Sequence, residues 1–315
     1  MNPNQFPRTF LIGHQNIDVS ALQCAVYCLC LFHTTSDADA VFDLRQLLQR
    51  HAGYAFIKRL IRLGVSAAVI ELKRNISCHL IDGEAGISSA TRERVLIMAT
   101  EMLDEDIAHF SRLTVPYISI DHDFTTQNIS TVAINNQMGT FQAIEYLVNM
   151  GHTDIGYVHT TEYISSWSER ALGYRQALAQ FWLPLSDDKV YRARYNGGNS
   201  YDDFCQVIAS GAQLPTALVT DDDVIAVGVM RALQDAGYRV PEDISIVGFN
   251  NRPVCELVHP MLTSIDVPKQ DFSTEAVDAL VSLIQKQQRG ELPKLAVKRR
   301  ITTTLIERQS VRRIP

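Results

Sequence analysis

Three consecutive stretches decide the fold: VPYISID (115–121), TVAINNQMGTFQAIEYLVNMGH (131–152) and DIGYVHT (154–160). The first and the last are short apolar runs with the length of buried strands, and the middle one has the spacing of a helix of about four turns. A strand, a helix and a second strand in so short a span predict a crossover between parallel strands. Ligands bind such sheets at the carboxyl ends of the strands, so polar residues at these ends are the first candidates for function.

The alternation continues toward the C-terminus. Helices are predicted at 165–182, 201–210, 224–238 and 273–291, the last with Ser273 as its N-cap. Strands are predicted near 189–195, 216–223, 241–251, 262–268 and 294–310, with a Gly/Asn turn at 196–199. The first 110 residues also carry mixed signals, including a helix running into a strand at 56–72 and a strand at 95–101. Their patterns do not establish the order of these strands in a sheet.

The composition is that of a globular α/β protein. The chain has 315 residues, 20% charged and 46% hydrophobic, which is enough for two lobes with separate cores. A net charge of −6 provides no overall basic field, so any contact with nucleic acid must come from a local patch or a separate module.

The cysteines and the N-terminus predict a cytoplasmic protein. Three of the six cysteines lie in one apolar run, 21–32, and no CxxC pair exists, so buried thiols are expected rather than a zinc site. The first ten residues have no apolar core typical of a secretory leader, and the run 21–32 is too short to cross a bilayer. We therefore expect no metal, no cofactor and no membrane contact.

Several strings of the chain together identify a family. They are the stretches quoted above and SERALGYRQAL (168–178), TALVTDDDVIAVGVMRAL (216–233), GYRVPEDISIVGFNN (237–251) and HPMLTSID (259–266). Through them, residues 104–315 resemble the core domain of LacI/GalR-family transcriptional regulators, which is related to periplasmic sugar-binding proteins.

The resemblance implies two doubly wound parallel-sheet lobes joined by three crossing strands, a fold like that of periplasmic binding proteins. The crossings are expected near Ala133–Asn135, Ile265–Pro268 and Val297–Arg299. The N-terminal lobe would comprise residues 1–134 and 268–297, and the C-terminal lobe residues 135–267 and 298–315.

The resemblance also implies that a small effector, usually a sugar or nucleoside, binds in the cleft between the lobes. The candidate effector-binding residues are Asp121, Arg170, Tyr195, Asp222, Asp223 and Asn250. The Asp121 carboxylate can accept hydrogen bonds from hydroxyl groups, and the planar guanidinium of Arg170 can donate two parallel ones.

Each candidate also has a purely structural interpretation. Asp121 fits a cap, Arg170 a surface ion pair and Tyr195 a core aromatic residue, while the acids at 221–223 fit caps for the helix that follows. Asn250 stands where the family usually has Asp, and Asp222 where it often has Asn or Ser, so the hydrogen bonds offered to an effector differ from the family pattern. His152 is expected to be a structural turn residue.

The DNA-binding part of the family is an N-terminal helix-turn-helix headpiece whose second helix enters the major groove. The opening residues 1–24 do not resemble it. Two later fragments, IKRLIRLGVSAAV (57–69) and GISSATRERVL (86–96), are faintly similar to a degenerate helix-turn-helix within 57–103. The same residues also fit strands and helices of the N-terminal lobe, and both interpretations remain open here.

The chain is therefore predicted to be a homodimeric LacI/GalR-like regulator, in which a sugar or related metabolite controls binding to operator DNA. Differential affinity of the effector for two conformations would provide that control. The alternatives are a headpiece-free cytosolic sugar-binding module without DNA binding and, as a third class, an α/β enzyme that uses the acids Asp221–Asp223. No Ser/His/Asp set, phosphate loop or metal motif supports the enzyme. The effector, the operator and the direction of regulation are left open.

Overall fold

The structure, a computed structural model, describes residues 67–71, 95–99, 117–121, 127–161, 165–195, 197–291 and 294–315. The chain divides into two compact units. The first unit comprises Met1–Ala133 and Lys269–Ile301, and the second comprises Ile134–Pro268 and Thr302–Pro315. The chain therefore passes between the units three times, after Ala133, Pro268 and Ile301.

The first unit contains a five-stranded sheet. Its strands, in spatial order, are β1 (Ala67–Glu71), β2 (Val95–Ala99), β3 (Tyr117–Ile120), β4 (Thr131–Ile134) and β10 (Lys298–Ile301). The first four pair in parallel. Strand β10 lies beside β4, and the Thr131 N–H donates to the Val297 carbonyl at 2.9 Å at the start of this pairing. The third passage between the units comes directly after β10. Helix α10 (Lys269–Gln288) contacts β3.

The predicted helix-turn-helix region falls on this unit. Two described segments lie within 57–103, and both are parallel strands of the sheet, β1 and β2. The remainder of that region, with its basic residues, lies outside the described residues, as do Cys24, Cys28, Cys30 and Cys78. Cys205 and Cys255 are free thiols.

The second unit contains a six-stranded sheet. Its strands, in spatial order, are β11 (Thr304–Ile306), β9 (Thr263–Asp266), β8 (Ser245–Asn250), β7 (Ala217–Thr220), β5 (Ile155–Thr160) and β6 (Val190–Ala193). All neighbours are parallel except β11 and β9. The chain builds β6 on one side of β5 and β7 on the other, so the order reverses between β5 and β7. This reversal is the topological switch point where open α/β sheets bind ligands.

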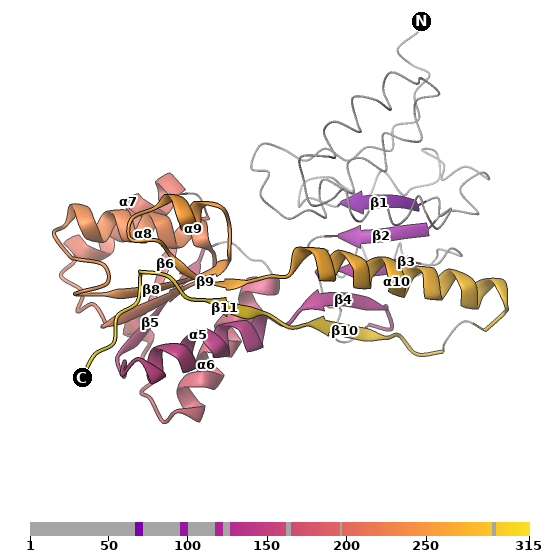
Figure 1. Cartoon of the computed structure of the whole chain (residues 1–315), viewed down its shortest axis with the longest axis horizontal. Coiled ribbons are helices and arrows are strands. Elements are labelled where there is room, and N and C mark those ends of the chain that lie inside the picture. Colours follow the sequence, from indigo (N-terminus) through magenta and orange to yellow (C-terminus); the bar gives the residue numbers. More distant parts are fainter. Residues whose placement is uncertain are drawn as a thin grey trace, which may run out of the picture. The chain divides into compact units, whose positions relative to one another are not determined.

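Helices cover both faces of this sheet. Figure 1 shows α5 (Asn136–Asn149) and α6 (Ser165–Gln180) on one side, and α7 (Gly197–Ala209), α8 (Asp223–Asp235) and the short α9 (Val254–Leu257) on the other. Strand β5 shows why both faces are apolar. Tyr157 stacks on Tyr174 of α6 with ring centroids 4.9 Å apart, while the next residue, Val158, joins the core under α7 and α8. The doubly wound α/β class is thereby confirmed.

Several elements differ from the sequence prediction, among them the strand expected over 294–310, which is two strands, β10 and β11, in different sheets. Helix α7 begins at Gly197, so most of the expected turn at 196–199 is its first turn, where small residues are tolerated. Helix α10 begins at Lys269, directly after Pro268, which places Ser273 inside the helix and not at its N-cap. Helix α9 and the 3-10 turn Asp187–Lys189 were not predicted because each is about one turn long.

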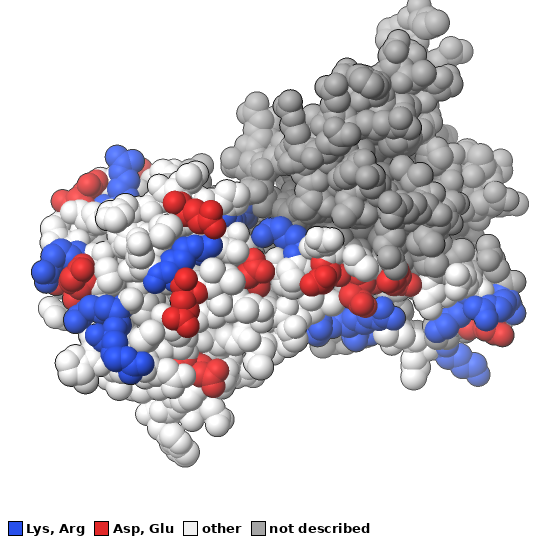
Figure 2. Space-filling view, in the orientation of Figure 1, with Lys and Arg blue, Asp and Glu red and all other residues white. Residues whose placement is uncertain are grey.

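Charges are mixed on the surface. Figure 2 shows basic and acidic side chains interspersed over the described part of the visible face, without a large field of one sign. No helix in the described part of the chain is long and apolar enough to span a membrane.

Candidate functional site

Arg170 is the centre of a polar network at the carboxyl ends of β5, β7 and β8. It projects from α6 and is only 5% exposed. Its Nε donates to Asn136 Oδ1 at 2.9 Å, its Nη1 to the Asp221 backbone carbonyl, and its Nη2 weakly to Asn250 Oδ1 at 3.4 Å. Its guanidinium carbon lies 3.8 Å from the centroid of the Phe249 ring. This burial excludes the surface ion pair, and the described acceptors of Arg170 are all uncharged groups.

Asp222 caps a helix and joins the network at the same time. Its Oδ1 accepts from the Val224 N–H at 2.8 Å, which makes it the N-cap of α8. Its Oδ2 accepts from Asn250 Nδ2 at 2.5 Å and pairs with Arg252 Nη2 at 3.2 Å. Asn250 therefore donates to Asp222 and accepts from Arg170, so Asp222 is both a helix cap and a member of the polar network, and effector binding by Asp222 stays a prediction.

Asp223 is surrounded by protein groups. It is fully buried, its Oδ1 accepts from Ser264 Oγ at 2.6 Å, and its Oδ2 accepts from the Arg252 N–H at 2.7 Å. A side chain at Gly248 would overlap this carboxylate, which explains the glycine in β8. Burial, and secondarily the Asp222 carboxylate, raise the pKa of Asp223 to about 7. These contacts support α8 and β8, and effector binding by Asp223 stays a prediction.

Two aromatic residues flank the network. The Tyr195 hydroxyl accepts from Arg252 Nη2 at 2.7 Å, and its ring lies 4.8 Å from that of Trp167. Tyr195 is half-buried and also packs against the core under α7 and α8, as its core interpretation requires.

Asp121 belongs to the first unit. It follows β3 with a left-handed φ of 67°, and its N–H donates to the Val132 carbonyl at 3.0 Å. The backbone there needs a residue that tolerates positive φ, as aspartate does. Its role toward an effector also stays a prediction.

Two further residues belong to the polar network and were not predicted as effector-binding residues, His159 and Asp221. Asp221 is fully buried, and its carboxylate accepts from the Tyr157 hydroxyl, from the Thr160 N–H at 2.6 Å and from His159 Nδ1 at 2.6 Å. Burial and this carboxylate raise the pKa of Tyr157 well above its usual value. The alternation of side chains along β5 puts Tyr157 and His159 on the same face of the sheet. Polar groups at a buried strand end need hydrogen-bond partners, so this pattern could have predicted that both residues share an acceptor.

His152 is structural, as predicted. It is 1% exposed, with Nδ1 2.9 Å from Thr216 Oγ1 and Nε2 3.1 Å from the Arg312 carbonyl. Among the residues that the structure describes, no group of His, Cys, Asp and Glu side chains is arranged to hold a metal ion.

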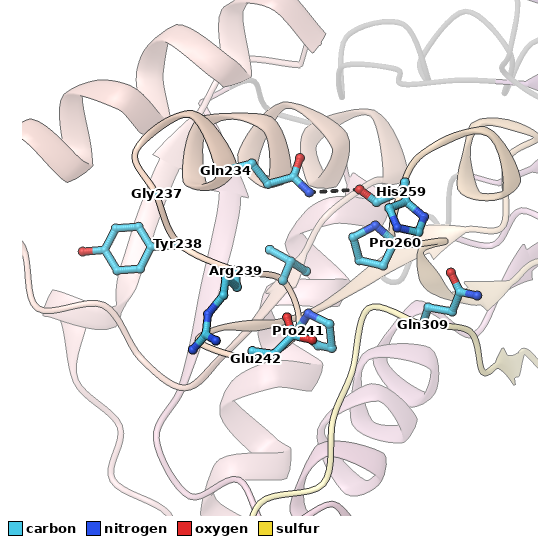
Figure 3. A pocket seen from close by; sticks show the side chains of 10 residues that line it. Gln234, Gly237, Tyr238, Arg239, Pro241, Glu242, His259, Pro260 and Gln309 are labelled. Atoms are coloured by element: carbon cyan, nitrogen blue, oxygen red, sulfur yellow. Dashed lines mark hydrogen bonds between the residues drawn. The ribbon is translucent and has the colours of Figure 1, made fainter.

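An open pocket of about 720 Å³ lies elsewhere in the second unit (Figure 3). It is found at the C-terminal end of α8, where Gln234 Nε2 donates to the His259 carbonyl at 2.9 Å. The polar network lies at the N-terminal end of the same helix, and none of the predicted site residues lines this pocket. Convergent polar groups at a switch point are the stronger mark of a binding site, so we place the candidate site at the network.

The comparisons with known proteins agree with this architecture. The periplasmic binding protein-like domain family matches residues 144–311. A probable transcriptional repressor of Bacillus subtilis, ExuR, is 28% identical over 255 residues, which cover 80% of this chain and 74% of the repressor. The chain spans about 58% of the length of two other curated relatives, the catabolite control protein A of Priestia megaterium and the repressor PurR of Vibrio parahaemolyticus.

Solved structures show the same fold. A dimeric lac repressor has a TM-score of 0.69 and 25% identity, and the match covers 84% of this chain and 94% of that one. A LacI-family regulator of Enterococcus faecium with bound ribose has a TM-score of 0.59 and 24% identity, covering 70% and 80% of the two chains. More than half of this chain matches the family. It therefore belongs to the periplasmic binding protein-like domain family, and its relatives include the transcriptional repressor ExuR and the transcriptional regulator GalR.

Proposed function

We propose that this chain is a cytoplasmic transcriptional regulator, not an enzyme, whose second unit binds a small polar effector at the ends of β5, β7 and β8. The carrying observation is the buried guanidinium of Arg170, which lies over Phe249 at the switch point with only uncharged acceptors. Burying a charged group away from water costs free energy, so a buried guanidinium without a charged partner points to a functional role. Oriented polar groups in an apolar setting are typical of ligand sites.

In this proposal the predicted residues have different roles. Arg170 and Asn250 hydrogen-bond the effector, Asp222 with Arg252 holds Asn250 in place, and Tyr195 with Trp167 borders the site. Asp121 and Asp223 complete the proposed set. The ribose bound by the Enterococcus faecium relative supports a sugar or related metabolite as the effector class. Effector binding would shift a homodimer between states that differ in affinity for operator DNA.

The first test removes the guanidinium. Arg170→Ala is expected to weaken binding of the best sugar from a panel by about ten- to a hundredfold, because a hydrogen bond from a charged group is lost. Isothermal titration calorimetry measures this directly. Arg175→Ala is the matched control, since Arg175 lies on the same helix with a side chain that is 56% exposed. Unchanged affinity in the Arg170 variant would reject the proposed site.

The chain contains its own optical reporter for this titration. It has two tryptophans, of which Trp182 is exposed and Trp167 is buried beside Tyr195. In a Trp182→Phe background, a change of Trp167 emission on adding sugar is expected for the wild-type site and is expected to vanish with Arg170→Ala.

The second test concerns DNA. Fluorescence anisotropy with random-sequence duplexes at about 50 mM and about 200 mM salt should show affinity that falls steeply with salt, because phosphate contacts release counterions. A protein that binds sugar but shows no affinity for DNA at either concentration would instead be the headpiece-free sugar-binding module.

A further inference from the structure

One residue, Asp221, orients two nitrogen-bearing side chains at the switch point between β5 and β7. Its backbone carbonyl accepts from Arg170 Nη1, and its carboxylate Oδ2 lies 2.6 Å from His159 Nδ1. Tyr157 and the Thr160 N–H occupy the rest of the carboxylate. Asp221 is fully buried, so its orientation is set entirely by protein contacts.

This contact determines which way the His159 ring presents its nitrogens. A carboxylate only accepts hydrogen bonds, so Nδ1 must carry the hydrogen that lies between the two side chains. The other nitrogen, Nε2, then points away from Asp221 and has no hydrogen-bond partner among the described residues. The His159 side chain is 15% exposed, which leaves that edge of the ring accessible to a small molecule.

A ligand atom at Nε2 either donates to the neutral ring or accepts from the protonated ring, and the charges around the site decide between the two. With Nδ1 against the buried carboxylate, an oxyanion at Nε2 would bind the imidazolium form, in which both nitrogens donate. The neighbouring carboxylates already have donors of their own: Arg252 and Asn250 for Asp222, and Ser264 for Asp223. Glu169 accepts from Asn136 Nδ2 at 3.0 Å. Arg170, with uncharged acceptors only, offers a second cation on the same face of the sheet.

We propose that His159 contacts the effector through Nε2, that Asp221 is its positioning residue, and that the effector carries an oxyanion, either a carboxylate or a phosphate. The inference rests on the proposed function, because it assumes that the effector binds at this network. It adds a specificity-determining residue and a chemical class to that function.

Matched probes separate the charge from the sugar ring. D-glucose, D-glucuronate and D-glucose 6-phosphate share a skeleton and differ at one carbon, as do the corresponding galactose compounds and the pair ribose and ribose 5-phosphate. In calorimetric titrations of the wild-type protein, one acidic member is expected to bind at least about tenfold tighter than its neutral partner. Comparing the affinities of the carboxylate and phosphate probes shows which of the two oxyanions the protein prefers.

His159→Gln is expected to abolish this preference, because it lowers the affinity for the acidic member at least about tenfold and the affinity for its neutral partner by a smaller factor. His259→Gln is the matched control, since His259 is an exposed histidine of the same unit and lies outside the network. Thermal melts without ligand establish that each variant is folded.

Nitrogen-15 NMR of the histidine rings tests the positioning role of Asp221. The free protein should show His159 with a hydrogen on Nδ1, and saturation with the preferred acid should show both nitrogens protonated. Asp221→Asn should disturb this pattern and reduce the acid preference, because an amide can present a donor to Nδ1. A merely structural Asp221 would change the melting temperature and leave the ring signals and the preference intact.

The outcomes are distinct. Equal affinity for acidic and neutral partners, or a preference that persists in His159→Gln, overturns the inference and leaves the proposed function standing. Absence of binding to every probe in the panel counts against both.

Discussion

Trp182 combines two features that are rarely found in one large residue. Its side chain is 94% exposed, and its backbone has a left-handed φ of 56°. The Trp182 N–H donates to the Ala179 carbonyl and the Leu183 N–H to the Leu178 carbonyl, which is the bonding that ends a helix with a left-handed residue, usually glycine. Tryptophan at this position carries a steric cost that glycine avoids.

We expect Trp182→Gly to raise the free energy of unfolding by about 0.5–1 kcal/mol, since relief of the left-handed strain exceeds the entropy cost of glycine. Urea denaturation followed by circular dichroism measures the change. Trp182→Ala separates the causes, because it removes the exposed ring and keeps the strain. A gain in Trp182→Ala equal to that in Trp182→Gly would show that the backbone conformation is not the source.

The segment after β11 is attached to the rest of the second unit by a buried histidine. His152 lies between Thr216 Oγ1 and the Arg312 carbonyl, and nearby the Ile314 N–H donates to the Met150 carbonyl at 2.8 Å. Gly151, with φ 94°, is required at the same turn because a side chain there would collide with the Ile314 carbonyl. The turn before β5 thus holds the end of the tail, in addition to the contacts that the tail makes with β8, such as that of the Arg312 N–H with Ser245 Oγ at 3.1 Å.

This attachment should depend on pH. Burial lowers the pKa of His152 below its ordinary value of 6.5, so the folded state binds a proton less readily than the unfolded chain. The stability that comes from neutral His152 is therefore present above that value and is lost as the pH falls below it. Urea unfolding at about pH 8 and about pH 5.5 should show a smaller loss for His152→Gln than for the wild type. An identical loss in both proteins would assign the pH dependence to other groups.

The second unit is assembled from two separate parts of the sequence, 134–268 and 302–315. The later part supplies β11 and a buried serine, Ser310. Its hydroxyl donates to the Ile246 carbonyl at 2.6 Å and accepts from the Thr263 N–H at 2.8 Å, so it connects the return of the chain to β8 and β9. The first-unit sheet is similarly completed by β10 from late in the chain.

Ser310→Ala should lower the free energy of unfolding by about 2–4 kcal/mol, because it leaves two buried backbone groups without partners. Ser210→Ala is the matched control, since the Ser210 hydroxyl also bonds a carbonyl, at 2.7 Å, but lies at the surface. Similar small losses in both variants would show that water satisfies the groups left by Ser310.

Local patterns predicted most of the second unit, because its strands are apolar runs that end in polar residues. Strands β5, β7 and β8 and helices α6 and α8 were expected where they occur, and Arg170 was expected on its helix. The interactions among the site residues were harder to predict from the sequence. Whether Asp222 caps α8 or binds Asn250 depends on two strands meeting, and sequence spacing alone could not show that it does both.

The unpredicted part of the site has the same cause. Asp221 was visible only as one of three consecutive acids, and its partners Tyr157 and His159 are more than 60 positions away in the chain. Their contact exists because β5 and β7 are neighbours in the sheet, an adjacency that only the order of strands reveals. Helix α7 similarly starts earlier than its Gly/Asn composition suggests, because packing against α8 outweighs weak local preference.

Asp221 contacts Arg170 through its main chain and His159 through its side chain, and this difference has a consequence for the evolution of specificity. Arg170 is anchored by a main-chain oxygen, which every amino acid at position 221 would supply, whereas His159 depends on the carboxylate itself. A substitution at this position can therefore change which effector the proposed site prefers, while the hydrogen bond to Arg170 persists. Closely related paralogues that differ at position 221 should accordingly recognise different metabolites, and they should also carry changes near Tyr157 and Thr160 that replace the lost acceptor.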